Sequence, residues 1–359
     1  MLTKEQKEKF NAWWSNSNTG RPLVNITGIK DASKNTYKTF DSPKDMYCNW
    51  EKKVYNYKEF IKNTEFFMEA FPHLTLDLGA GSLALYLGSE PIFSYDTVWF
   101  KELATKSMTD LPKFKYNPDN YWLNFHTNML KKAVEESERL FCIAMPDIIE
   151  NIDILSALRG TQNTCFDIYD NPELVKEKIT ELDSIYFKYF DDFYNIIKLD
   201  DNSSVYTAYD IWGPGKTAKI QCDFCAMMSP LQFKEFIIPS LEYQCNNLDN
   251  AMFHLDGKEA AVHLEALMEI KNLKALQWTP SNGIPDCFDD CWIEPIYDKV
   301  YNANKALHLH SVCLSVEKVK AGVSKLTERY GTKGMYYNIM GAYSVKEAEE
   351  IANFFETSF

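Results

Sequence analysis

The stretch Phe253-His254-Leu255-Asp256-Gly257 decides the fold, because it has the pattern of a buried strand that ends in polar groups. Three downstream stretches share this pattern: ALQWTP at 275–280, LHLH at 307–310 and MYYNIMG at 335–341. Segments with helical patterns separate them, at about residues 259–270, 296–304 and 316–330. Strands that alternate with helices predict β-α units and a parallel sheet.

Polar groups at the carboxyl ends of parallel strands are typical of a (β/α)₈ barrel, which places its chemistry there. We therefore predict an α/β protein, a (β/α)₈ TIM barrel with an N-terminal helical extension. The 359 residues, 45% of them hydrophobic, suffice for one large core. We expect one domain over residues 1–359, with the extension and first strand in 1–75 and the remainder of the barrel in 76–359.

The upstream sequence supplies further elements. A helix is predicted at 5–14, a first strand at 23–27, a helix at 46–70 and a helix at 171–197. The apolar run at 140–147 and the segment at 204–211 are predicted to be buried strands.

The charge of the chain excludes several classes of partner. The formal net charge is −13 and the sequence pI is about 5.0, so nucleic acids and anionic membranes are unfavourable partners. The charged start and the lack of a long apolar run predict neither a signal peptide nor a membrane helix. Nine cysteines in such a chain indicate reduced thiols in the cytoplasm.

Candidate catalytic residues lie at the strand ends. His254 and Asp256 have the same alternation parity, so both point to one side of the strand, toward the predicted barrel mouth. An acid and an imidazole at that distance suit proton transfer or the orientation of a ligand. Asp96 is the third candidate, a carboxylate beside the aromatic Trp99. A histidine bonded to the backbone and a helix-capping aspartate are the structural alternatives.

Six further side chains are candidates for binding a small-molecule substrate. They are strand-end aromatic, acidic or imidazole groups: Tyr209, Trp212, Asp223, Trp278, His310 and Trp99. Indole and phenol rings suit a planar or methylated ligand, and the glycines at 213 and 215 allow close approach of the backbone. The alternative for each is packing in the core, or a solvated loop acid for Asp223. No phosphate loop or nucleophile elbow is present.

These stretches together resemble the uroporphyrinogen decarboxylase superfamily, which also contains cobalamin-dependent methyltransferases. The clearest match is Phe253-His254-Leu255-Asp256-Gly257, similar to the family's (Tyr/Phe)-His-x-Asp-Gly stretch. Supporting matches occur in the same order as in the family: Pro146-Asp147, Leu158-Arg159-Gly160, Asp170-Asn171-Pro172-Glu173, and Met228-Ser229-Pro230 with Phe233, Phe236 and Pro239. The resemblance covers residues 90 to 355 and implies the same barrel fold.

The sequence departs from both branches of that family. The decarboxylase branch has an arginine-rich segment near the N-terminus, where this chain has only Arg21, and Ser94-Tyr95-Asp96 is a loose analogue of its catalytic segment. The methyltransferase branch binds zinc through His-x-Cys and a distant Cys. Here His254 matches, but Asp256 replaces the cysteine and 340–341 is Met-Gly. Zinc accepts carboxylate oxygen, so a zinc site at His254 and Asp256 is possible with a further ligand such as His310 or Cys313, but the motif is incomplete and no metal ligand is assigned.

The resemblance implies an enzyme. We consider three hypotheses for the role of the chain. The first is a corrinoid-linked methyltransferase-like protein that acts on a small substrate in the barrel mouth, with the corrinoid on a partner protein. The second is a decarboxylase, a lyase, on a substrate less anionic than a uroporphyrinogen. The third is a non-catalytic barrel that binds a tetrapyrrole or a small ligand. We expect no nucleic-acid or membrane partner in any case.

Overall fold

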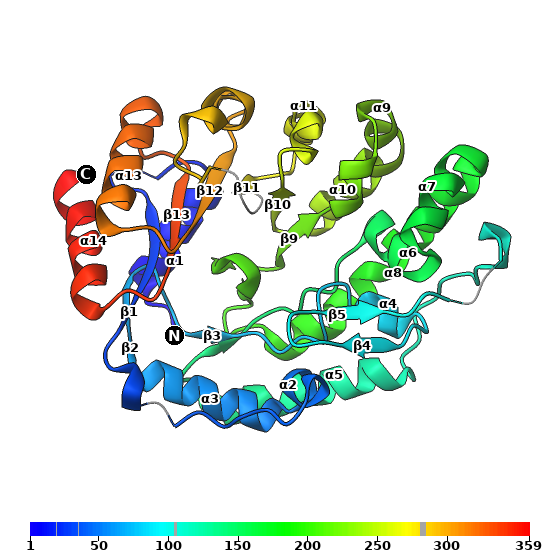
Figure 1. The fold of residues 1–359 in the computed structure, drawn as a ribbon, viewed down its shortest axis with the longest axis horizontal. Coiled ribbons are helices and arrows are strands. Elements are labelled where there is room, and N and C mark those ends of the chain that lie inside the picture. Colours follow the sequence, from blue (N-terminus) through cyan, green and yellow to red (C-terminus); the bar gives the residue numbers. More distant parts are fainter. Residues whose placement is uncertain (19, 35, 104–105, 281–284) are drawn as a thin grey trace.

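Across the residues that the computed structural model describes, 1–359 without 19, 35, 104–105 and 281–284, the chain forms a seven-stranded sheet in the order β2-β1-β13-β12-β11-β10-β9 (Figure 1). Its strands are β1 (Leu23–Ile29), β2 (Thr64–Met68), β9 (Thr217–Gln221), β10 (Asn250–Asp256), β11 (Ala275–Thr279), β12 (Ala306–Val312) and β13 (Met335–Met340). The pairings are parallel except that between β1 and β2. The fold is mixed α/β with a central parallel sheet.

The register of the sheet aligns polar side chains into two rows. The lower row contains one residue from each of five adjacent strands: Gln221, His254, Gln277, His308 and Tyr336. The upper row, two residues nearer the carboxyl ends, includes Asp256, Thr279, His310 and Asn338. Because side chains alternate between the faces of a strand with a period of two, both rows lie on one face.

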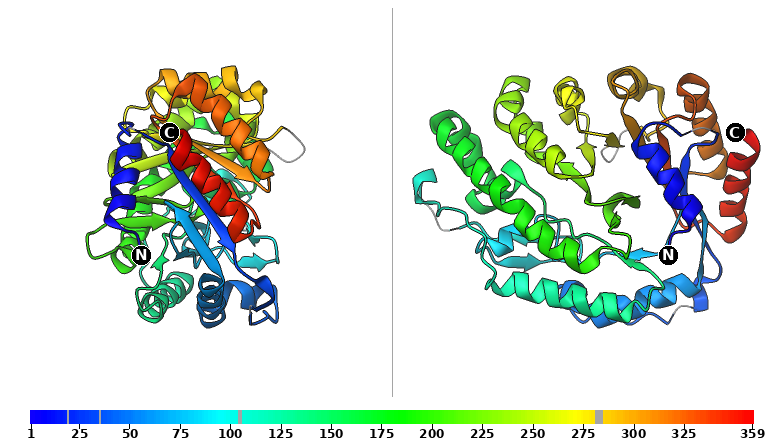
Figure 2. Two further views of the ribbon diagram at one scale, coloured as in Figure 1. Left: turned by 90° about the vertical axis from the view of Figure 1, so that its left-hand side faces the viewer. Right: turned by 180° about the vertical axis from the view of Figure 1, so that it is seen from behind.

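Helices that follow the strands cover the opposite face of the sheet (Figures 1 and 2). They are α9 (Pro230–Gln232), α10 (Ile238–Asn247), α11 (Leu264–Glu269), α12 (Asp298–Asn302), α13 (Val316–Tyr330) and α14 (Val345–Ser358). The helix α14 begins with a capping box formed by Ser344 and Glu347 and packs on β1. Coverage on both faces explains why all five residues of β9 are buried.

The other side of the molecule is mainly helical. Its helices are α2 (Pro43–Cys48), α3 (Trp50–Lys62), α4 (Leu83–Tyr86), α5 (Tyr121–Glu136), α6 (Asn151–Arg159), α7 (Thr161–Asp170) and α8 (Pro172–Ile197). Its strands are short: β3 (His73–Leu74), β4 (Pro91–Phe93), β5 (Val98–Phe100), β6 (Cys142–Ile143), β7 (Ser204–Tyr206) and β8 (Ile211–Gly213). The helix α8 starts where the sequence predicts it, with Pro172 at the first helical position and Asn171 at the N-cap position without a side-chain capping bond.

The ladder of strands is open among the described residues, with β2 and β9 at its two ends. Short parallel contacts continue the strand direction elsewhere: β3 pairs with β6, and Met145 bridges to Tyr206. Met145 N–H donates to the Val205 carbonyl at 2.8 Å. The β7–β8 hairpin then leads toward β9.

The N-terminal helix α1 (Lys4–Trp14) packs against the lower row. Thr3 and Gln6 form its capping box. The Trp13 indole is fully buried, donates to the Gly334 carbonyl at 3.0 Å and packs edge-on against Tyr336. Gly334 directly precedes β13, so this helix lies at the amino ends of the strands and leaves the carboxyl ends available for a site.

The largest local difference from the sequence prediction concerns residues 46–70. A single helix was expected there, but Asn49 caps a second helix and Thr64-Glu65-Phe66-Phe67-Met68 forms β2. Aromatic and β-branched residues favour a strand beside β1. Among the described residues, no helix is long and apolar enough to cross a membrane.

Candidate functional site

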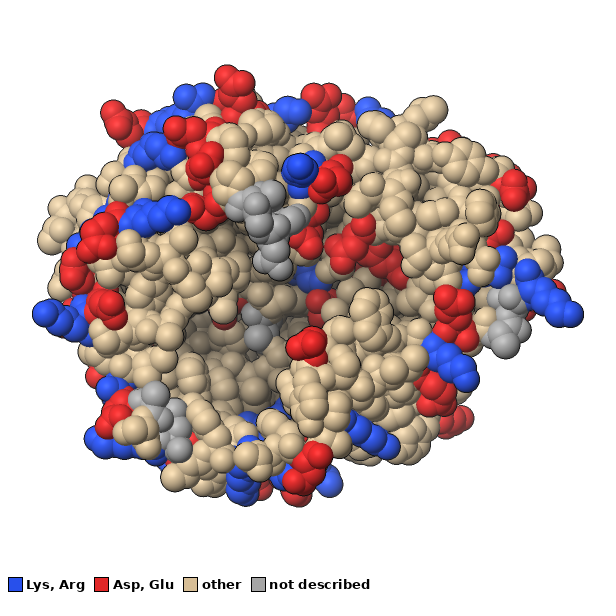
Figure 3. Space-filling view, in the orientation of Figure 1, with Lys and Arg blue, Asp and Glu red and all other residues tan. Residues whose placement is uncertain are grey.

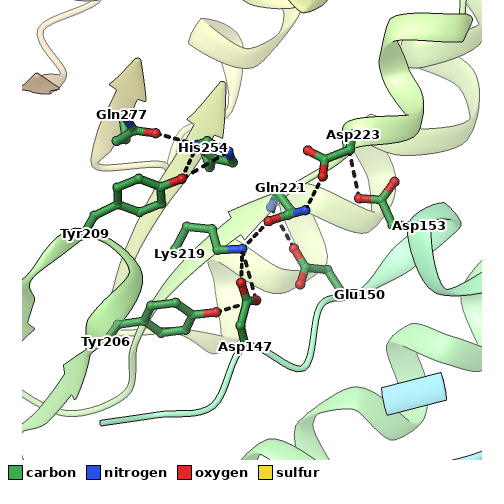
Figure 4. A network of polar contacts seen from close by, with 10 residues as sticks. All are labelled: Asp147, Glu150, Asp153, Tyr206, Tyr209, Lys219, Gln221, Asp223, His254 and Gln277. Carbon is green, nitrogen blue, oxygen red and sulfur yellow. Dashed lines mark hydrogen bonds and ion pairs between the residues drawn. The ribbon is translucent and has the colours of Figure 1, made fainter. Parts of the chain in front are cut away.

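Ten polar side chains lie near the carboxyl ends of β9 and β10 in two hydrogen-bonded groups: Tyr209, His254 and Gln277 form one, and the other seven form the second (Figure 4). We call them the polar network: Asp147, Glu150, Asp153, Tyr206, Tyr209, Lys219, Gln221, Asp223, His254 and Gln277. Alternation along β9 turns Lys219 and Gln221 to the face that also carries His254. The acids at 147, 150 and 153 arrive from the segment that follows β6 and from the start of α6.

His254 is held between a phenol and an amide. The Gln277 amide nitrogen donates to Thr279 Oγ1 at 2.7 Å, which turns its oxygen toward His254 Nδ1. Nδ1 therefore carries the proton, and Nε2 accepts from the Tyr209 hydroxyl at 3.1 Å. Burial, followed by the charge of Lys219, lowers the pKa of His254 to about 4. The imidazole is neutral at pH 7.

Lys219 has a buried amino group that is paired with the carboxylate of Asp147. Its Nζ lies 3.0 and 2.8 Å from the two carboxylate oxygens of Asp147 and also contacts the Gln221 oxygen. Tyr206 donates to the same carboxylate at 2.7 Å. A buried charge is costly without a hydrogen-bonded partner of opposite sign, and Asp147 is that partner for Lys219.

Glu150 and Asp153 accept backbone hydrogen bonds that hold the end of β9 and the segment directly after it. Glu150 accepts from the Gln221 N–H at 2.8 Å, and burial raises its pKa well above the usual value. Asp153 accepts from the N–H groups of Asp223 and Phe224 at 2.8 and 2.9 Å. Asn151 has a φ of 51°, a strained conformation that its hydrogen bond to the Gln221 carbonyl helps to hold.

Asp223 is a carboxyl group of the network with a pKa near neutral pH. It accepts from the Gln221 amide nitrogen at 2.8 Å. Desolvation in the site and the neighbouring Asp153 raise its pKa to about 7. A carboxyl with this pKa can both donate and accept a proton near pH 7, which makes Asp223 the best-suited acid-base group here.

A cavity of about 430 Å³ opens beside Asp223. Asp153, Gln221 and Asp223 line one side, and Trp99 and Phe100 from the β4–β5 hairpin line another. Figure 3 shows a hollow on one face of the molecule, with acidic side chains above and to the right of it. A cavity of this volume accommodates a small organic molecule.

The sequence-predicted residues near the network share this edge of the sheet. Asp256 is exposed, and its charge contributes to the raised pKa values of Asp223 and Tyr209. The ring of His310 lies edge-on to Tyr209 with a centroid distance of 5.7 Å. Burial lowers the pKa of His310. Tyr209 and His254 are in direct contact, as described above.

The remaining candidates have different surroundings. Asp96 is exposed in the turn between β4 and β5, whereas Trp99 on the same hairpin lines the cavity. Trp212 is buried and donates to Ser203 Oγ at 3.0 Å. Trp278 is buried against Trp292, with ring centroids 5.0 Å apart. Both indoles therefore pack in the core rather than against the cavity.

A second cluster lies around Asp210, directly after Tyr209. Its carboxylate oxygens meet His73 Nε2 at 2.9 Å and the Asn338 amide at 2.7 Å. The φ of Asp210 is 52°, so the chain turns sharply here. This anchored turn holds Tyr209 over the sheet beside His254.

Sequence reasoning missed Lys219, Gln221, Glu150 and Asp153 as members of the site. The alternation Lys219-Ile220-Gln221 was a usable signal, because two polar residues of one parity precede the cysteine-rich segment that contains Asp223. Pro146-Asp147 was noted for its resemblance only. The contact between Asp147 and Lys219 spans distant segments and has no local signature.

The donor set at His254 does not fit zinc. Both ring nitrogens of His254 are within hydrogen-bonding distance of Tyr209, and Nδ1 is also engaged by Gln277. No group of three or more His, Cys, Asp or Glu side chains arranged for a metal ion occurs within the described part of the chain. Cys313, a ligand considered above, is exposed at the end of β12.

Comparison with known proteins finds a likeness in structure and not in sequence. No family model matches the sequence, and no curated protein matches it. Among solved structures, the chain is similar to a methyltransferase from Methanosarcina mazei, with a TM-score of 0.62 and 11% sequence identity over 98% of each chain. At this identity the likeness concerns the fold.

Proposed function

We propose that this chain is an enzyme of the uroporphyrinogen decarboxylase superfamily that transfers a methyl group between a small substrate and a corrinoid carried by a partner protein. The polar network beside a cavity at the carboxyl ends of the strands supports a catalytic role most strongly. The likeness to a methyltransferase fold along both chains supports the reaction class.

We also propose that the architecture is a single-domain (β/α)₈ barrel. The short β3–β6 ladder and the Met145–Tyr206 bridge support continuation of the strands between β1 and β9. The network would then lie at the barrel mouth, since its members follow or flank the carboxyl ends of the strands.

The rim of the cavity fits contact with a corrinoid-bearing partner. Ile92 and Trp99 face each other across the β4–β5 hairpin and, like Met227, are largely exposed. Exposed apolar side chains of this kind favour association with another surface. A bound corrinoid supplies a metal centre that accepts or donates the methyl group.

The chain's own residues would prepare the substrate. The cavity positions it, while the hydrogen bond between Tyr209 and the neutral His254 keeps the adjoining wall of the sheet in a fixed arrangement. Asp223 would take or return a proton when the substrate gains or loses its methyl group. No step is assigned to zinc, because the donors do not fit it.

Decarboxylation is the second candidate. A carboxyl with a pKa of about 7 could protonate the carbanion left by loss of CO₂, and Asp223 is such a group. The scarcity of arginine, four residues in the whole chain, favours a substrate with few carboxylates.

A methyl-transfer assay tests the proposal. The purified chain is mixed with cob(I)alamin and a panel of methylated amines, thiols and ethers, and formation of methylcobalamin is followed by absorbance. We expect methylation that depends on the enzyme and falls by about 10²–10⁴-fold in Asp223→Asn. Release of CO₂ from small carboxylic acids without any methylcobalamin would replace the proposal with decarboxylation.

A further inference from the structure

The cavity next to the polar network is lined by acids without a basic side chain. Glu102, Asp153 and Asp223 are its three carboxyls, and none forms an ion pair with a residue that the structure describes. The nearby ammonium, Lys219, is already paired with Asp147. Negative charge in the cavity is therefore left without a cationic partner.

The cavity lining also contains aromatic and apolar side chains. Trp99, Phe100 and Phe224 line the cavity together with Met227. The Trp99 side chain is 66% exposed. An indole on a two-stranded hairpin could instead pack against the rest of the protein, so this ring is open to a ligand. Aromatic faces attract organic cations through the ring quadrupole, and this attraction adds to that of carboxylates.

We propose that the cavity binds a small organic cation, a methylated or protonated amine, whose charge lies between the carboxylates of Asp153 and Asp223 and whose alkyl groups contact Trp99. This inference rests on the proposed function and names its substrate class. A methylated ammonium group is also a chemically suitable methyl donor, because the amine leaves as a neutral molecule with the bonding electron pair.

The cavity distinguishes this cation from other ligands. A hard divalent ion requires several converging oxygen ligands, and no group of three or more suitable donors is arranged for a metal within the described residues. An anion would meet three acids. A neutral alkyl compound would fill the space but leave the charge uncompensated.

Binding should be linked to the protonation of Asp223. Its pKa is raised by desolvation and by Asp153, Asp256 and Asp147, whereas Lys219 opposes the rise. A bound cation stabilises the ionised form, so binding of a permanent cation releases a proton. Affinity for a quaternary ammonium therefore rises as the pH increases through 7 and levels off above it.

Isothermal titration of the full chain with choline tests the inference. The comparison ligand is the neutral carbon analogue of choline, in which a tert-butyl group replaces the trimethylammonium group. We expect choline to bind at least about tenfold more tightly than the analogue, and to release protons near pH 7 when the titration is repeated in buffers of different ionisation enthalpy.

Two variants locate the site and one serves as a control. Trp99→Ala, on an exposed side chain, should weaken choline binding about tenfold without loss of folding, and Asp223→Asn should also remove the proton release. Glu349→Gln removes a charge from the exposed face of α14 and should leave binding unchanged. Circular dichroism checks the fold of each variant.

Equal affinity for choline and its neutral analogue, or undiminished binding in Trp99→Ala, would overturn the inference. The titration uses no corrinoid, so its outcome is independent of turnover. Choline binding without methylcobalamin formation from any donor would contradict the proposed function and leave the inference standing. Methyl transfer from neutral donors alone would contradict the inference and retain the function.

Discussion

At the scale of single residues, burial and hydrogen-bond partners set the charge of each side chain in the polar network. His254 is neutral because burial disfavours its charged form, and burial raises the pKa of Glu150 for the same reason. The exception is Lys219 with Asp147, where two opposite charges compensate each other. The protonation state of each group therefore follows from its immediate partners, and substitutions of those partners should change it predictably.

Gln277 controls the protonation of His254, and replacement by glutamate should show this. In Gln277→Glu a carboxylate faces Nδ1 and stabilises the imidazolium, so the pKa of His254 should rise from about 4 by one to three units. Imidazole NMR signals followed against pH measure the change. An unchanged pKa in a folded Gln277→Glu variant would show that this side chain does not face the ring.

Lys219 and Asp147 should be strongly coupled in stability. Lys219→Met leaves the Asp147 carboxylate partly buried without its cation, which should lower the free energy of unfolding by about 3–5 kcal/mol. Adding Asp147→Asn removes the orphaned charge and should restore a large part of that loss. Urea unfolding of the two single variants and the double variant gives the coupling. Additive losses would argue against a direct pair.

At the scale of elements, the period of the strands explains what the sequence could and could not predict. Alternation correctly placed His254 and Asp256 on one face, because a strand's geometry is local. The partners of Lys219 come from the segment after β6, and folding brings them close without any local signal. Trp212 and Trp278 were expected at the cavity, but their burial depends on Ser203 and Trp292, contacts that the strand pattern does not encode.

The helix α1 should contribute to stability and not to ligand binding. Trp13→Ala removes a fully buried indole and should lower the free energy of unfolding by about 3–5 kcal/mol. Trp13→Phe keeps much of the packing but loses the hydrogen bond to Gly334, so its loss should be smaller. Urea unfolding measures both. A change in choline affinity in folded Trp13→Phe would contradict the assignment of this helix to the amino ends of the strands.

At the scale of the whole molecule, the parallel sheet gathers the chemistry at one edge. The β-α rhythm of residues 250–359 was predicted correctly, because each strand and helix carries its own periodicity. The closed barrel stays a prediction, since the described ladder ends at β2 and β9. The cavity is lined by acidic side chains, and the net charge of the whole chain is −13. Both charges favour a cationic substrate over an anionic one.

A crystal structure of the chain grown with choline would test most directly whether the cavity beside the polar network is the substrate site. We predict ligand density between Asp223 and Trp99, within reach of Asp153, with Lys219 still paired to Asp147. Density at another surface, with the cavity filled by its own side chains, would contradict the account.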